Sequence, residues 1–178
     1  MASRDATALV GMIVFLGSWA MTFVALLFSF GVAREGVGTW PPNALGAVSP
    51  WLPAATTLVV IASSALLEWG RRARRGSLIA AAAACGGVFL WLQAILALEL
   101  AQAGLGLQAS AGAMIYALAG FHAAHAIVGV LGLAATAALH GWRRRRGAPA
   151  GHGFHLWCMF WHFVGVAWLA IYAAVFVL

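Results

Sequence analysis

Charged side chains are scarce in this sequence. Lysine is absent, acidic residues number only 4, and all charged residues together make up 8% of the chain. A soluble domain carries about 25% charged residues, whereas 64% of this chain is hydrophobic. These proportions exclude a soluble globular domain and indicate an integral membrane protein.

The 10 basic residues are all arginines, and most of them are clustered. Residues 71–75 hold four and residues 143–146 hold another four, each run lying between apolar stretches. Short arginine-rich loops of this kind are typical of loops retained in the cytoplasm. A sequence pI of 11.1 raises the question of nucleic acid, but no aromatic residues interleave with the arginines as a single-strand platform requires. We therefore expect no nucleic-acid partner.

Cysteine is rare as well, and neither copy suggests a disulfide framework. Cys85 and Cys158 both fall inside apolar stretches, where a free cysteine acts as a small buried hydrophobe. The first apolar run, residues 6–33, is about twice as long as the core of a cleavable signal peptide. We expect this run to be a membrane span.

Five apolar stretches are long enough to cross a bilayer as helices, which takes about 20 residues. They are about twice as long as a barrel strand and do not alternate between apolar and polar residues, so strands are excluded as the main element. The predicted fold class is an all-α integral membrane protein. We predict one transmembrane domain over residues 1–178, a bundle of five transmembrane helices at about residues 6–33, 51–70, 77–102, 110–140 and 153–178.

The connections between these spans carry their own signals. The loop over residues 34–53 holds four of the five prolines, and Trp40-Pro41-Pro42 within it is expected to be extended. Ser77 is expected to cap the third span, and Gly104 is expected to mark the turn after it. Arg4 and both arginine runs fall on one side of a five-span chain, while only Arg34 falls on the other. This asymmetry predicts a cytoplasmic N-terminus and a periplasmic C-terminus.

Two histidines, His122 and His125, lie in the middle of the fourth span, where polar side chains are costly and need a partner or a function. Haem ligation with His162 of the last span is one reading. However, His125 lies about 16 residues and His162 about 9 residues from the inner ends of their spans, a depth difference of roughly 11 Å by helical rise. Two axial ligands of one haem must face each other at nearly equal depth, so depth argues against haem.

The last span opens with side chains that copper prefers, namely His155, Cys158, Met159 and His162. Because His155 and His162 are about 10 Å apart along a helix axis, a single ion could use only two of them. We therefore expect hydrogen-bonded or interfacial packing residues here and no metal site.

Other chemistry is not indicated. Glu68 and Glu99 lie near span ends, where a carboxylate can reach water, so a solvated carboxylate is favoured over a proton relay. A pore or transporter would want a polar midplane and interrupted helices, and no span is interrupted. The sequence also holds no nucleotide-binding glycine loop, no nucleophile with its base and no paired carboxylates. We expect no catalytic residues.

Four short motifs nevertheless occur in a recognisable order. They are Trp40-Pro41-Pro42, Leu92-Gln93-Ala94, Gly120-Phe121-His122-Ala123-Ala124-His125, and Trp161-His162-Phe163-Val164 with Trp168. The set resembles subunit III of the haem-copper respiratory oxidases, and order and spacing extend over residues 15–178. The chain is similar to the short five-span bacterial form of this subunit.

The resemblance implies a non-catalytic accessory subunit without its own cofactor, in the inner membrane of a bacterium. Haem and copper are expected in the partner subunits I and II, and phospholipid is expected between the helices. A larger respiratory supercomplex is a further partner that the resemblance allows. The alternative function is a subunit III-like protein of a nitric oxide reductase, and a haem-binding membrane cytochrome ranks below it. The sequence leaves open whether the electron donor is cytochrome c or quinol. The expected packing or lipid-contact residues are Trp40, Gln93, His122, His125, Trp161, His162 and Trp168.

The chain departs from the family pattern at its carboxylates. Trp19, His155 and Gly165 stand where the family has acids. The acid expected after Leu92-Gln93-Ala94 falls on Leu96, although Glu99 lies one turn further on and is a possible retained carboxylate. Whether the chain keeps a family role in proton uptake is therefore left open by the sequence.

Overall fold

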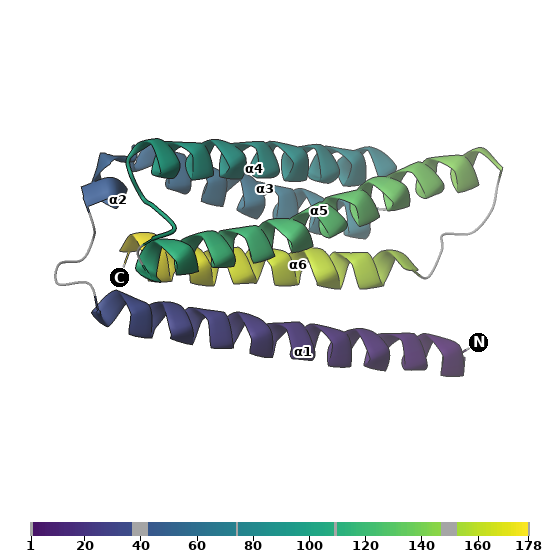
Figure 1. The fold of residues 1–178 in the computed structure, drawn as a ribbon. Helices are drawn as coiled ribbons and strands as arrows, with labels where there is room; N and C mark the ends of the chain where they lie inside the picture. Colours follow the sequence, from purple (N-terminus) through teal and green to yellow (C-terminus); the bar gives the residue numbers. More distant parts are fainter. Residues whose placement is uncertain (1, 37–42, 74, 109, 147–152, 178) are drawn as a thin grey trace.

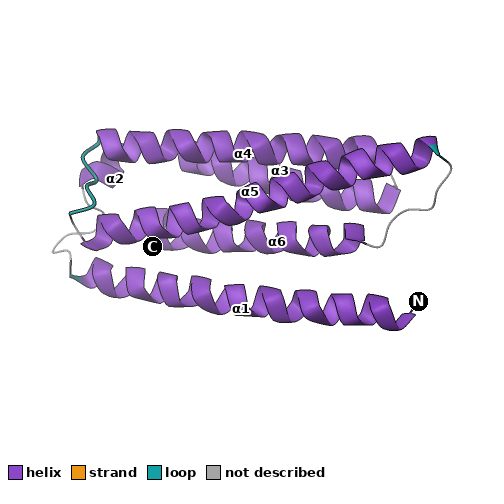
Figure 2. Cartoon of the chain, turned by 45° about the vertical axis from the view of Figure 1, so that its right-hand side comes forward, coloured by secondary structure: helices purple, strands orange, loops and turns teal. Residues whose placement is uncertain are grey.

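A computed structural model describes residues 2–36, 43–73, 75–108, 110–146 and 153–177, and all regular structure in these ranges is helical (Figures 1 and 2). The elements are α1 (Ala2–Glu35), α2 (Asn43–Ala47), α3 (Trp51–Ala73), α4 (Gly76–Gln102), α5 (Ser110–Arg145), α6 (Gly153–Tyr172) and the π-helical turn η1 (Ala173–Val177). In these ranges, five helices are long and apolar enough to cross a membrane. The prediction of an all-helical protein with five spans is confirmed.

The helix boundaries correct the expectations in detail. α5 continues through Arg145, and a short helix, α2, stands in the loop between the first two spans. α4 begins at Gly76, one residue before the predicted cap Ser77; its N-cap residue is Arg75, and no described side chain caps this end. The cap prediction was therefore wrong. The extended segment predicted at Trp40-Pro41-Pro42 lies outside the described residues.

The turn after α4 was predicted correctly. Gly104 has a φ of +87°, a backbone conformation that favours glycine because it has no Cβ. The backbone N–H of Leu105 donates to Leu100 O at 3.0 Å and that of Gly104 donates to Ala101 O at 3.1 Å. These bonds satisfy carbonyls at the end of the helix and turn the chain back toward α5.

Successive spans run antiparallel, so the ends of the bundle differ in charge. The N-terminus, the connection from α3 to α4 and the end of α5 lie at one end, while α2 and the C-terminus lie at the other (Figure 1). Arg71, Arg72 and Arg75 of the first run and Arg146 of the second therefore share the end that holds the N-terminus. The fold places the charges as the sequence pattern requires.

Four helices form the core of the bundle, and α1 lies outside it. α3 packs against α4, α4 against α5, α5 against α6, and α6 against α3, which closes a ring. α1 lies along α5 and α6 (Figure 1), and only Phe23 and Phe30 of its large apolar side chains are buried. Most of α1 presents apolar side chains outward, among them Ile13, Val14, Met21, Val24, Phe28 and Val32.

Candidate functional site

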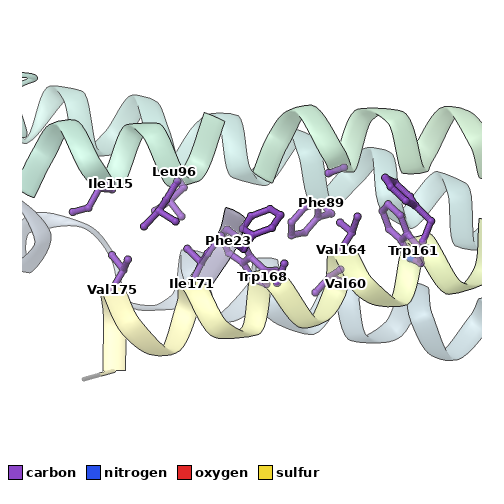
Figure 3. Packing of buried hydrophobic residues seen from close by; sticks show 14 of the residues in the cluster. Phe23, Val60, Phe89, Leu96, Ile115, Trp161, Val164, Trp168, Ile171 and Val175 are labelled. Atoms are coloured by element: carbon purple, nitrogen blue, oxygen red, sulfur yellow. The ribbon is translucent and has the colours of Figure 1, made fainter. Parts of the chain in front are cut away.

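Trp161 of α6 belongs to the cluster of buried apolar side chains in the core of the bundle (Figure 3). It is fully buried and passes between two glycines of neighbouring helices. A Cβ on Gly86 of α4 would lie 2.9 Å from Trp161 Cη2, and a Cβ on Gly129 of α5 would lie 2.7 Å from Trp161 Cε3. Both positions must lack a side chain for the indole to fit, so Gly129 makes room for Trp161.

The indole N–H of Trp161 is held by α3. It donates to Ser63 Oγ at 3.1 Å, and the Ser63 hydroxyl donates in turn to Ala82 O of α4 at 2.7 Å. A buried tryptophan usually finds such an acceptor, because an unpaired N–H is costly without water. Trp161 therefore joins four helices through packing and hydrogen bonds.

Trp168 repeats this arrangement two turns further along α6. It is buried, and its indole N–H donates to Thr57 Oγ1 of α3 at 3.0 Å. The Thr57 hydroxyl donates in turn to Pro53 O, one turn earlier in the same helix, at 2.9 Å. The indole ring of Trp168 packs edge-on against Phe89 of α4, with the ring centroids 5.3 Å apart. The aromatic side chains of α6 thus fasten it to α3 and α4.

His122 of α5 contacts both α4 and α6. The amide nitrogen of Gln93 on α4 donates to Ala119 O at 3.2 Å and lies 3.4 Å from His122 Nδ1. His122 Nε2 lies 3.0 Å from Val164 O of α6; because a carbonyl only accepts, Nε2 carries the proton. Both ring nitrogens are therefore engaged, and His122 could not ligate a haem iron without breaking a contact between helices.

His125 has a different environment, although it lies three residues away on the same helix. Its Nδ1 donates to Phe121 O of its own helix at 2.7 Å. The ring packs edge-on against Trp19 of α1, with centroids 4.4 Å apart, and against Phe23 at 5.4 Å. Trp19 occupies one of the positions where the resembled family has an acid. In this chain the position therefore makes an aromatic contact with His125 instead of carrying a carboxylate.

The side chains at the start of α6 separate. His155 is exposed, Met159 and His162 are half-buried, and Cys158 is buried at 3% exposure. Among the described residues, no three His, Cys, Asp or Glu side chains come together as a metal site would require. In the described part of the chain, the candidate copper ligands of α6 therefore do not gather into one cluster.

The carboxylates take two different roles. Glu68 accepts hydrogen bonds from Arg71 at 2.6 and 2.7 Å and from Arg72 at 2.6 Å. The expectation of a solvated carboxylate at Glu68 did not include these ion pairs, although arginines three and four residues further along a helix can reach it. Glu99 is half-buried near the end of α4. At Gly165, one of the positions where the resembled family has an acid, the residue is buried and a Cβ would lie 3.4 Å from Ser64 Oγ of α3.

Sequence reasoning found most of the central side chains but missed their partners. Of the seven side chains expected to pack or to contact lipid, Gln93, His122, His125, Trp161 and Trp168 are buried. His162 is half-buried, and Trp40 lies outside the described residues. Ser63, Thr57 and Gly86 were not identified. A buried indole predicts that some acceptor exists, but the acceptor on α3 is about 100 residues away in the chain and cannot be chosen from spacing.

The contrast between the two histidines gives a prediction. We expect His122→Leu to lower the free energy of unfolding by about 2 kcal/mol, because it removes a bond between helices and leaves a Gln93 hydrogen without its partner. His125→Leu should cost clearly less, since its hydrogen bond stays within one helix. Thermal unfolding of the purified chain in mild detergent, followed by tryptophan fluorescence, compares them. Equal losses would show that His122 does not hold the helices together.

Ser63, Gln93 and His122 thus each make a hydrogen bond that joins two helices of the bundle. A protein-family model described as cytochrome c oxidase subunit III matches residues 4–178. The chain is 30% identical over 182 residues to cytochrome c oxidase subunit 3 of Thermostichus vulcanus, with 94% of this chain and 86% of that protein covered.

Similarity extends to plant proteins of the same description. Over 183 residues the chain is 29% identical to cytochrome c oxidase subunit 3 of Triticum aestivum and 30% identical to that of Arabidopsis thaliana. In both cases 93% of this chain is covered but only 66% of the relative. The chain therefore spans slightly less than two thirds of the length of these plant relatives.

Proposed function

The chain belongs to the cytochrome c oxidase subunit III family, and from this we propose that it is the non-catalytic accessory subunit III of a bacterial haem-copper terminal oxidase. In this role it packs beside catalytic subunit I, together with subunit II, and stabilises the catalytic subunit. Haem and copper belong to those partners. Phospholipid occupies surfaces of this chain that face the membrane.

One observation carries this proposal, namely the use of the polar side chains inside the membrane spans. His122, Gln93, Ser63 and Thr57 all make hydrogen bonds that join helices or complete those of a tryptophan. A protein that moves protons, ions or electrons needs some intramembrane polar groups free to act. A bundle whose buried polar groups serve packing is what a structural subunit requires.

The charge distribution supports a specific orientation in the bacterial inner membrane. Arg71, Arg72, Arg75 and Arg146 lie at the end of the bundle that holds the N-terminus, while Arg34 lies at the other end. Because arginine-rich loops stay in the cytoplasm, we place the N-terminus in the cytoplasm and the C-terminus in the periplasm. Trp69 and Trp142, exposed near the arginine-rich end, suit the membrane interface.

Co-purification tests the proposal directly. The full chain, carrying an affinity tag, is isolated from its native membrane in mild detergent, and the proteins that travel with it are identified. We expect a haem-copper catalytic subunit that reduces oxygen. Recovery without any such subunit would contradict the proposal, and recovery with a nitric oxide reductase would assign the chain to that complex.

Attachment to the complex provides a second prediction. We expect His162→Ala to weaken retention of the chain in the purified oxidase about fivefold, equivalent to one lost hydrogen bond of about 1 kcal/mol, while the haem spectra stay unchanged. His162 is half-buried in the tenth position of α6, where a polar ring needs a neighbour.

His155→Ala is the matched control for this experiment. His155 is exposed in the third position of the same helix, where water can satisfy its ring, and we expect normal retention. Subunit stoichiometry after purification measures both variants. A changed haem spectrum in His162→Ala would instead indicate that His162 ligates a haem. Equal retention of the natural chain, His162→Ala and His155→Ala would show that His162 is not part of the contact surface.

A further inference from the structure

Gln93 holds a buried hydrogen-bond acceptor that the protein does not use. The side chain is only 6% exposed, and no described residue donates a hydrogen bond to its Oε1. Buried polar atoms are nearly always paired with protein or with ordered water, and each exception calls for an explanation. This atom lies in the middle of the bundle, where bulk water cannot reach it.

The orientation of the amide explains why Oε1 is left over. The Gln93 nitrogen lies 3.2 Å from Ala119 O and 3.4 Å from His122 Nδ1. A carbonyl oxygen can only accept, so the nitrogen and not the oxygen must face Ala119 O. Rotating the amide by half a turn would place two oxygens against each other. The oxygen is therefore fixed on the side away from these partners.

Gln93 also lines a small cavity between α4, α5 and α6. The cavity has a volume of about 30 Å³ and a nearly apolar lining that includes Leu96, Ile115, Trp168 and Ile171. Tyr116 is the other side chain of the lining with a polar group to spare. Its hydroxyl donates to Leu105 O at 3.1 Å, so its lone pairs can still accept. A cavity needs roughly 10–15 Å³ of such volume to hold one water molecule, so this one has room for it.

We propose that this cavity is a binding site for one water molecule, which donates a hydrogen bond to Gln93 Oε1. A purely apolar cavity of this size stays dry, but a fixed and unpaired amide oxygen gives the water a strong acceptor. The water adds one more hydrogen bond to the series that runs from Gln93 of α4 through His122 of α5 to Val164 O of α6.

Filling the cavity tests whether it is wet or dry. Ala97 also lines it, and Ala97→Val adds two methyl groups that would displace a water. The substitution is made in the natural chain and in Gln93→Met, whose side chain has a similar volume but no oxygen to leave unpaired. The four full-length proteins are purified in mild detergent, and their thermal midpoints are compared in a double-mutant cycle.

The water site predicts opposite behaviour in the two backgrounds. Ala97→Val should lower the midpoint by about 3 °C when Gln93 is present, because Oε1 loses its partner, and should not lower it in Gln93→Met. An equal loss in both backgrounds would mean that valine simply does not fit. A raised midpoint in the natural chain would mean that the cavity is dry, and either result overturns the proposal.

Direct observation provides a second test. A density map of the chain in its native complex, at a resolution that resolves ordered waters, should contain a peak within about 3.2 Å of Gln93 Oε1. A map that resolves waters elsewhere in the complex but has no peak here would also overturn the proposal. The site concerns packing within this chain, so neither experiment depends on which catalytic subunit the chain accompanies.

Discussion

Trp161→Ala should lower the free energy of unfolding of this bundle by about 3 kcal/mol or more, the largest loss expected from one truncation. Trp161 is fully buried and contacts α4 and α5 through two glycines, and its N–H bonds to Ser63 of α3. In a membrane the helices gain little from leaving lipid, so packing and hydrogen bonds carry their association. Removing the indole leaves a cavity that the surrounding helices can fill only in part.

Trp91→Ala is the matched control. Trp91 lies on α4 and is 63% exposed, so the same truncation creates no internal cavity and should change stability by less than about 0.5 kcal/mol. Thermal and denaturant unfolding of the purified chains measures both. If Trp91→Ala costs as much as Trp161→Ala, the tryptophan at the centre of the bundle has no special role in holding it together.

Gly129→Val should cost about 2 kcal/mol or more by the opposite mechanism. A Cβ at Gly129 would lie 2.7 Å from Trp161 Cε3, and Trp161 is fixed by its surroundings and cannot move aside. Forcing additional atoms into a filled core displaces backbone or side chains, which is destabilising. We expect a lower thermal midpoint and poorer recovery of folded protein.

Gly120→Val provides the control on the same helix. No other described atom lies within 4 Å of the position that its Cβ would occupy, so the added side chain meets only open space. The expected change in stability is within about 0.5 kcal/mol. A loss equal to that of Gly129→Val would show that α5 tolerates no glycine replacement, whatever its contacts.

Combining the two central substitutions sharpens this argument. If valine at position 129 destabilises because it meets Trp161, then Gly129→Val should cost much less in a chain that already carries Trp161→Ala. Residues in contact show such non-additive effects, whereas distant ones add. Strict additivity would mean that the glycine and the tryptophan do not share this space.

The comparison of sequence and structure is clearest at Gly129. The sequence places a glycine one turn after His125, and the natural expectation is room beside that histidine. The structure gives the space to Trp161, while His125 packs against Trp19 of α1. A missing side chain signals that something approaches closely, but it does not say which element approaches, because that depends on how separate helices rotate about their axes.

The histidines show the same limit. Depth along the spans was enough to argue against haem ligation by His125 and His162, because helical rise is fixed at about 1.5 Å per residue. It could not predict that His122 contacts Val164 O of α6 and Gln93 of α4. Those contacts depend on crossing angles and on which faces of α4, α5 and α6 meet.

The sequence by itself determined the membrane location, the helical class and the five spans, because the scarcity of charge and the length of the apolar runs are local properties of the chain. It also determined which connections carry the arginines, and it contained the motifs that resemble the family. Only the tertiary structure decided that Trp161 sits between Gly86 and Gly129 and that Gln93 Oε1 is left unpaired. Such pairings join helices far apart in sequence, and they are fixed by close packing in three dimensions and not by any periodicity along the chain.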